Sequence, residues 1–190
     1  MPAADYLFWI KLDFVLAVLL TVLIPLLLLL FSIKEPPLQY RLLAYWRISA
    51  LLAITVYLLM AEISIGLLSG VIARILIPPV LWLGDGLMKS SSPLAAPGTS
   101  TYRLFYWWRG AISNYCLLGV IFTLPLLQCG WTGKVTERCA AWYIPPQMFG
   151  SLLHEPTQWQ IFGEYALIAL VVYAAYLLAA ISRLLYIRRA

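Results

Sequence analysis

The chain has 190 residues, of which 63% are hydrophobic and only 11% are charged, whereas about a quarter of the residues in a soluble domain are charged. Its apolar stretches are continuous and reach the roughly 20 residues that a helix needs to cross a bilayer, which excludes a membrane β-barrel with its short alternating segments. The net charge of +5 comes from basic residues beside apolar runs, where they set topology, so nucleic acid is not an expected partner. We therefore expect an all-α, polytopic integral membrane protein that forms one membrane domain over residues 1–190.

Five apolar stretches are long enough to be transmembrane helices. The predicted helices cover residues of about 14–33, 43–61, 66–83, 110–127 and 161–187. The second and third come from one apolar stretch that a tight turn near 62–65 divides, and Pro78 and Pro79 are expected to kink or end the third. A Gly-, Ser- and Pro-rich loop is predicted over 84–107, and a longer loop over 128–160 has room for short structure of its own.

The distribution of basic residues predicts the orientation of these helices. With five spans, one side collects most of the lysines and arginines, including Arg41, Arg47 and the basic residues at the C-terminus, and Lys and Arg gather on the cytoplasmic side of membrane proteins. The N-terminus is then lumenal or periplasmic and the C-terminus is cytoplasmic. The loop over 84–107 is cytoplasmic and the loop over 128–160 lies on the outer side.

Cys129 and Cys139 both fall in the predicted outer loop. Because that side of the membrane is oxidising, a structural disulfide between them is the favoured interpretation. Free thiols and redox catalysis are the alternatives, but a membrane thiol relay uses a C-x-x-C pair with a partner pair, and the sequence has neither. Cys116 falls within the fourth predicted helix and is expected to be a small buried residue.

Two helices carry small residues at the spacing that lets helix backbones approach closely. On the third predicted helix these are Gly66, Ser69, Gly70 and Ala73, and on the fifth they are Ala175 and Ala179. The sequence therefore predicts a helix-packing face on each of these helices.

Arg74 extends the packing face of the third helix, four residues after Gly70. An arginine at mid-span is costly, so it normally faces protein, water or lipid head groups. Three interpretations stay open: Arg74 lies in the last turn of a helix that ends at Pro78 and reaches the cytoplasmic interface; it has a buried partner such as Asn114; or it serves transport or pigment binding.

The remaining polar residues give weaker signals. Glu62 and Glu164 lie near the outer ends of predicted spans and are expected at the interface. His154 is the single histidine of the chain, and one histidine cannot build a zinc site, which needs three or four ligands. No phosphate-binding glycine loop, nucleophile elbow or metalloprotease motif is present, so we expect no metal site and no enzymatic activity.

The apolar segments resemble a known family. The runs VLAVLLTVLIPLLLLL from Val15, YWRISALLAITVYLL from Tyr45, ARILIPPVLW from Ala73 and YCLLGVI from Tyr115 resemble cyanobacterial membrane proteins catalogued as a domain of unknown function. The resemblance implies a cyanobacterial membrane, either the thylakoid or the cytoplasmic membrane, where photosynthetic complexes are abundant. It carries no motif with an assigned role.

Two functions follow as hypotheses. The first is an accessory or assembly subunit that packs against a larger photosynthetic membrane complex, with a photosystem as the suspected partner, membrane lipids around it, and chlorophyll, carotenoid or lipid as candidate ligands at the interface. The second is a small transporter or permease-like component, indicated by Arg74 and the proline-interrupted helices; it predicts a polar cavity at mid-membrane depth.

Overall fold

The computed structural model is an all-α bundle, which confirms the predicted fold class. It describes residues 3–33, 35–87 and 100–189, and within them five helical segments are long and apolar enough to cross a membrane. The spanning elements are α1 (Ala3–Val18) continued by η1 (Leu19–Leu23) and α2 (Ile24–Phe31), then α3 (Pro36–Met60), α4 (Ile65–Leu87), α5 (Ser100–Thr123) and α9 (Trp159–Arg189). These segments fit an integral membrane location.

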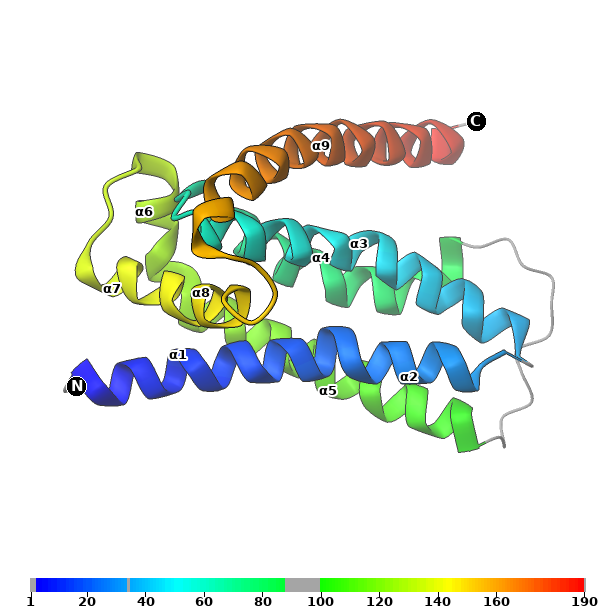
Figure 1. Cartoon of the computed structure of the whole chain (residues 1–190). Coiled ribbons are helices and arrows are strands. Elements are labelled where there is room, and N and C mark those ends of the chain that lie inside the picture. The colour runs from blue at the N-terminus through cyan, green and yellow to red at the C-terminus, as the bar shows by residue number, and fades with distance from the viewer. Residues whose placement is uncertain (1–2, 34, 88–99, 190) are drawn as a thin grey trace.

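Helix α3 lies at the centre of the bundle (Figure 1). It packs against α4 on one side and against α9 on another, while α5 packs against α4 and α2. The N-terminal end of α1 and the C-terminal end of α9 lie at opposite ends of the bundle. An odd number of spans requires this arrangement, because each span moves the chain to the other side of the membrane.

Short helices gather at the end of the bundle where α1 begins and α9 begins (Figure 1). They occupy much of the segment that the sequence predicts as an outer loop. These elements are η2 (Leu124–Leu126), α6 (Leu127–Thr132), α7 (Glu137–Ala140), η3 (Ala141–Tyr143), α8 (Ile144–Gly150) and η4 (Pro156–Gln158). We call residues 127–150 the cap, because they pack against the ends of α1, α3 and α4.

A π-helical turn interrupts the first span at Leu19–Leu23, just before Pro25. Proline has no backbone N–H, so a carbonyl one turn earlier loses its usual partner. Side chains from other helices supply donors there: Tyr45 Oη donates to the carbonyl of Thr21 at 2.7 Å, and Trp108 Nε1 donates to the carbonyl of Leu20 at 2.8 Å. The irregular turn is therefore fixed by α3 and α5.

Tyr45 and Trp108 are consequently core residues of the bundle. Tyr45 is 1% exposed and Trp108 is 3% exposed, and their rings meet edge to face at 5.0 Å between centroids. They belong to a core cluster that also includes Leu42, Phe105 and Ile112. In the membrane, packing of this kind and buried hydrogen bonds hold helices together, since lipid is as apolar as leucine.

Several predicted helix boundaries need correction. The first helix begins at Ala3 and not near residue 14. The second begins at Pro36, because proline is well accommodated in the first turn of a helix, where no N–H is needed. The fourth predicted span begins at Ser100, so residues 100–107 are helical and not loop.

Of the two outcomes predicted for Pro78 and Pro79, a kink or an end of the third helix, the end is wrong. Helix α4 continues through both prolines to Leu87, since neighbouring helices in a membrane can compensate for the lost hydrogen bonds. Of the predicted cytoplasmic loop, residues 84–87 are therefore helical, and residues 88–99 lie outside the described residues. The turn between α3 and α4 falls where the sequence predicts it, with Glu62 in a left-handed conformation at φ 59°.

Candidate functional site

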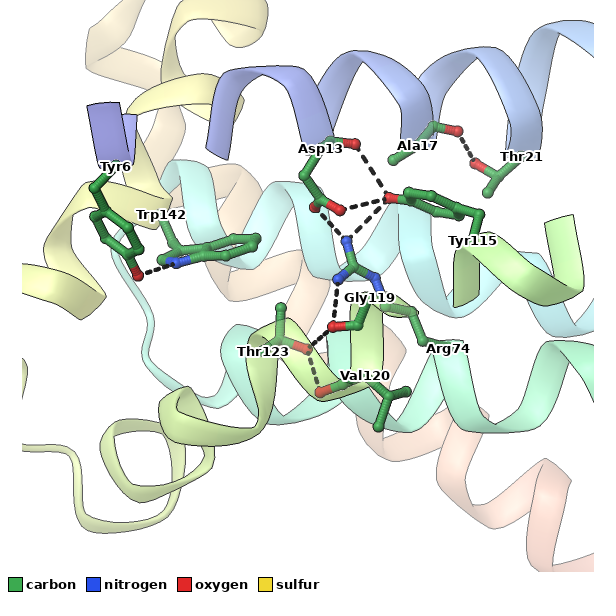
Figure 2. Close-up of polar contacts among 10 residues, drawn as sticks. All are labelled: Tyr6, Asp13, Ala17, Thr21, Arg74, Tyr115, Gly119, Val120, Thr123 and Trp142. Atoms are coloured by element: carbon green, nitrogen blue, oxygen red, sulfur yellow. Dashed lines mark hydrogen bonds and ion pairs between the residues drawn. The ribbon is translucent and has the colours of Figure 1, made fainter. Parts of the chain in front are cut away.

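Arg74 is buried within the membrane-spanning part of the bundle, where it forms an ion pair with Asp13 of α1 (Figure 2). The exposed fractions of the two side chains are 9% for Arg74 and 13% for Asp13. Tyr115 of α5 completes the group: Arg74 Nη2 donates to Tyr115 Oη at 3.0 Å. Tyr115 Oη also lies 3.1 Å from Asp13 Oδ1. Three helices are therefore joined at one polar point.

Gly119 makes room for the guanidinium of Arg74. A Cβ atom at Gly119 would lie 2.8 Å from Nη1 of Arg74, closer than real Cβ atoms approach a neighbour. The absence of a side chain lets Nη1 donate to the carbonyl of Gly119 at 3.1 Å. The guanidinium also lies over the ring of Tyr115, 5.4 Å from its centroid. Tyr115 and Gly119 are one helical turn apart and so share a face of α5.

This geometry separates the first two interpretations of Arg74 and does not test the third, a role in transport or pigment binding. Arg74 does not lie in a last helical turn, because α4 runs on to Leu87. Asn114 is not its partner: Asn114 is exposed and donates to the carbonyl of Gly110 in its own helix. Arg74 does have a buried partner, but it is Asp13, which the sequence analysis placed just before the first span.

Asp13, Tyr115 and Gly119 are the site residues that sequence reasoning missed. A signal for Asp13 existed, because a buried cation in a membrane span normally has a partner of opposite charge. Because the predicted first helix starts near residue 14, Asp13 falls outside it and is not expected to be buried in the membrane. Tyr115 and Gly119 carried no signal beyond their spacing of four residues.

A cavity of about 400 Å³ lies beside the ion pair, and its volume is in the range of small-molecule sites. Its walls come from α1, α3 and α4, and the cap closes one end with Trp142, Pro145 and Pro146. Nearly all of the lining is apolar, and Asp13 and Arg74 are its charged residues. The combination of an apolar slot with one polar group suits a molecule that dissolves in the bilayer.

Residues 7–188 match the family described as "Protein of unknown function (DUF3177)". The chain belongs to this family. No curated protein and no solved structure matches it.

The predicted packing residues of α4 in this DUF3177 protein face its other helices. Gly66 lies against α3, where a Cβ would meet Leu58 Cβ at 3.0 Å, and a Cβ at Gly70 would meet Thr55 Cγ2 at 3.2 Å. Ser69 Oγ and Thr55 Oγ1 share a hydrogen bond of 2.8 Å. Ala73 and Arg74 are buried as well. We call these five residues of α4, Gly66, Ser69, Gly70, Ala73 and Arg74, the α4 face.

Ala175 and Ala179, which we call the α9 pair, have a different position. Both are exposed. Helix α9 contacts α3 through other residues, including Tyr173, whose hydroxyl donates to the carbonyl of Arg47 at 3.0 Å. The same small-residue spacing occurs on α4 and α9. The α4 face packs against other helices of this DUF3177 chain, whereas the α9 pair is exposed.

A disulfide joins Cys129 and Cys139 within the cap. Gly130 holds α6 close to α4, because a Cβ there would lie 3.1 Å from the backbone nitrogen of Leu68. Burial raises the pKa of Tyr143 in the cap, and the negative charge of Glu62 raises it further. Cys116 is buried, as expected for a small apolar residue.

The other polar residues weighed in the sequence lie apart from the ion pair. Glu62 and Glu164 are exposed, and Glu62 Oε1 accepts from Gln147 Nε2 at 2.9 Å. His154 packs on Phe162, with 4.5 Å between ring centroids. Within the described ranges, no three His, Cys, Asp or Glu side chains come together in a group that could hold a metal ion.

Proposed function

We propose that this protein is an accessory or assembly subunit that packs against a larger membrane complex through α9. One observation carries the proposal: 11% of the apolar window of α9 is buried, the lowest share among the five described spans, against 17% for the first span, 33% for the fourth, 39% for α3 and 44% for α4. The α9 pair lies on this exposed surface together with Val171 and Leu178. Small residues at this spacing allow the backbone of a second helix to approach α9 closely. Contact with lipid chains alone does not require small residues.

A role in binding and not in catalysis is supported by how the buried polar groups are used. Asp13, Arg74 and Tyr115 bond to one another. The carboxylate neutralises the guanidinium, so neither is held ready as a general base or an anion site. We infer that the group fixes α1, α4 and α5 in one arrangement.

A photosystem is the partner that we propose. Support comes from the resemblance of the apolar segments to cyanobacterial membrane proteins, which implies a thylakoid or cytoplasmic membrane. The Lys and Arg distribution supports an N-terminus on the lumenal or periplasmic side and a cytoplasmic C-terminus. Chlorophyll, carotenoid or lipid are candidate ligands where α9 meets the complex.

Affinity purification of the tagged protein from native membranes in mild detergent tests this function. We expect photosystem subunits in constant ratio by mass spectrometry, and chlorophyll absorbance in the eluate. A tagged protein that elutes alone and colourless, from membranes in which photosystems stay intact, would contradict the proposal.

A small transporter is the alternative, and the cavity beside Arg74 and Asp13 is the observation that favours it. The hypothesis predicts a polar cavity, whereas the walls of this cavity are mainly apolar, so the candidate solutes are apolar too. Reconstitution in liposomes with a fluorescent apolar solute would show accelerated transfer between leaflets or vesicles if the protein transports. A rate equal to that of empty liposomes would remove this alternative.

A further inference from the structure

The cavity is elongated. Along the first span its lining extends from Ile10 to Val22, which is about 18 Å at 1.5 Å per residue. Its volume of about 400 Å³ is in the range of sites for one small molecule. An elongated space of this volume suits one extended hydrocarbon chain.

The cavity opens sideways between α1 and α3. Three residues of its lining, Val22, Ala50 and Ala53, are also exposed on the surface of the bundle. The short side chains of Ala50 and Ala53 leave a gap in the wall of α3. Because this surface faces the hydrocarbon of the bilayer, a ligand can enter from the membrane without crossing water.

Two groups along the slot offer hydrogen-bond donors that the protein does not use. Nε1 of Trp46 is buried and has no acceptor among the described residues, and Trp46 lines the cavity. The guanidinium of Arg74 carries five N–H groups, of which three donate to Asp13, Tyr115 and Gly119. Five minus three leaves two N–H groups of Arg74 without an acceptor among the described residues.

An unused donor in hydrocarbon is costly, because no water replaces the missing acceptor. Thr21 and Thr55 of the lining donate to carbonyls of their own helices. Neither hydroxyl oxygen accepts from Trp46 Nε1, which has no partner, or from Arg74, whose acceptors belong to Asp13, Tyr115 and Gly119. An acceptor brought by a ligand would satisfy Trp46 or Arg74. Since Asp13 already neutralises Arg74, an anionic group would gain little, and a neutral acceptor fits better.

We propose that this cavity binds a neutral membrane-soluble molecule with a single hydrocarbon chain and a carbonyl group, the chemistry of a prenylquinone. The chain occupies the apolar slot beneath the cap, and the carbonyl oxygen accepts from Trp46 Nε1 or from Arg74. This site is separate from the α9 surface on which the proposed function depends.

Equilibrium binding of a tritiated decyl-benzoquinone to the purified full chain in lipid nanodiscs tests the site. We expect saturable binding at one site per chain. Ala53→Phe and Ala50→Phe each place a ring in the slot, and each should weaken binding at least tenfold. Ala111→Phe is the matched control, because Ala111 is exposed on α5 and does not line the cavity, so its affinity should stay within about twofold of the wild type.

The role of the carbonyl is tested separately. Decylbenzene has the same chain without an oxygen, and it should compete at least tenfold more weakly than the decyl-benzoquinone. Trp46→Phe should lower the affinity for the quinone roughly fivefold to tenfold and shift the infrared carbonyl band of the bound probe toward its unbonded frequency.

Three results would overturn the proposal. The first is equal binding by the wild type and by folded Ala53→Phe and Ala50→Phe variants, as judged by gel filtration. The second is equal competition by decylbenzene or by decanoic acid, which would indicate unspecific binding of alkyl chains or an anion site. The third is an unchanged affinity and an unchanged carbonyl band in both Trp46→Phe and Arg74→Lys.

Discussion

The α4 face and the α9 pair carry the same small-residue spacing, yet the protein uses them differently. On α4, Gly66 lies against Leu58 and Gly70 lies against Thr55, so closely that a Cβ atom at either glycine would make a contact tighter than most real Cβ contacts. On α9, Ala175 and Ala179 face outward. The comparison teaches that small residues at this spacing let another helix come close. A second feature of the surface decides whether that helix belongs to the same chain or to a partner. On α4 that feature is Arg74, which needs a partner inside the chain.

The largest expected effect comes from breaking the polar group behind the α4 face. Arg74→Met leaves the carboxylate of Asp13 buried without a partner, and we expect the free energy of unfolding to fall by about 3–5 kcal/mol. Unfolding in mixed micelles with increasing sodium dodecyl sulfate measures it. Arg103→Met, on the exposed surface of α5, is the control and should change stability by less than about 0.5 kcal/mol.

The double variant Asp13→Leu with Arg74→Met sharpens this test. Because it removes both charges, it should recover part of the stability that the single variant loses. If Arg74→Met and the double variant were equally stable, the ion pair would not be what holds α1 to α4.

A smaller effect is expected from removing the disulfide in the cap. The cap packs against the start of α4. Replacing both Cys129 and Cys139 by serine frees a loop of sequence separation 10 and should cost about 2–3 kcal/mol. The same unfolding assay applies, and a reductant should lower the stability of the wild type to that of the variant. A reductant effect on the variant itself would point to another cause.

Gly119 tests whether close approach to Arg74 matters, and its effect should be smaller again. Gly119→Ala puts a methyl group 2.8 Å from Nη1 of Arg74 and should destabilise the fold by about 1–3 kcal/mol. Gly110→Ala is a matched control in the same helix, because a Cβ there meets nothing within 4 Å. That control should be neutral or slightly stabilising, since alanine favours helix. Equal effects at both glycines would mean that Arg74 is not tightly held.

The smallest effect on stability is expected on α9. Ala175→Leu with Ala179→Leu should change the free energy of unfolding by less than about 0.5 kcal/mol, because both positions are exposed. Ala73→Leu, at a fully buried position of the α4 face, should cost about 1–3 kcal/mol. Comparable losses of unfolding free energy from the α9 and α4 substitutions would contradict the claim that only the α4 face packs within the fold.

The fold class follows from the sequence because long apolar runs in a membrane can only be helices. The turn between α3 and α4 could also be placed, since 43–83 is too long for one span. The boundaries near prolines could not, because a proline can end a helix, stand in its first turn as Pro36 does in α3, or lie inside it as Pro78 does in α4.

The candidate site was only half predictable. Arg74 stands out as a charge within an apolar run, and its position on a small-residue face indicates protein contact. Its partners lie on other helices, at sequence separations of 61 for Asp13 and 41 for Tyr115, so no local pattern links them. The cavity could not be predicted either, because it depends on how α1, α3 and the cap pack together.

Site-specific photo-crosslinking tests the central claim most directly. A benzophenone amino acid is placed at Ala175 or, as the control, at Leu118, which is also exposed but lies on α5. After illumination of native membranes, we predict a crosslink from Ala175 to a subunit of a larger complex and only lipid adducts from Leu118. The same adducts at both positions, with no protein attached to Ala175, would contradict the account, because α9 would then face lipid like any other exposed helix.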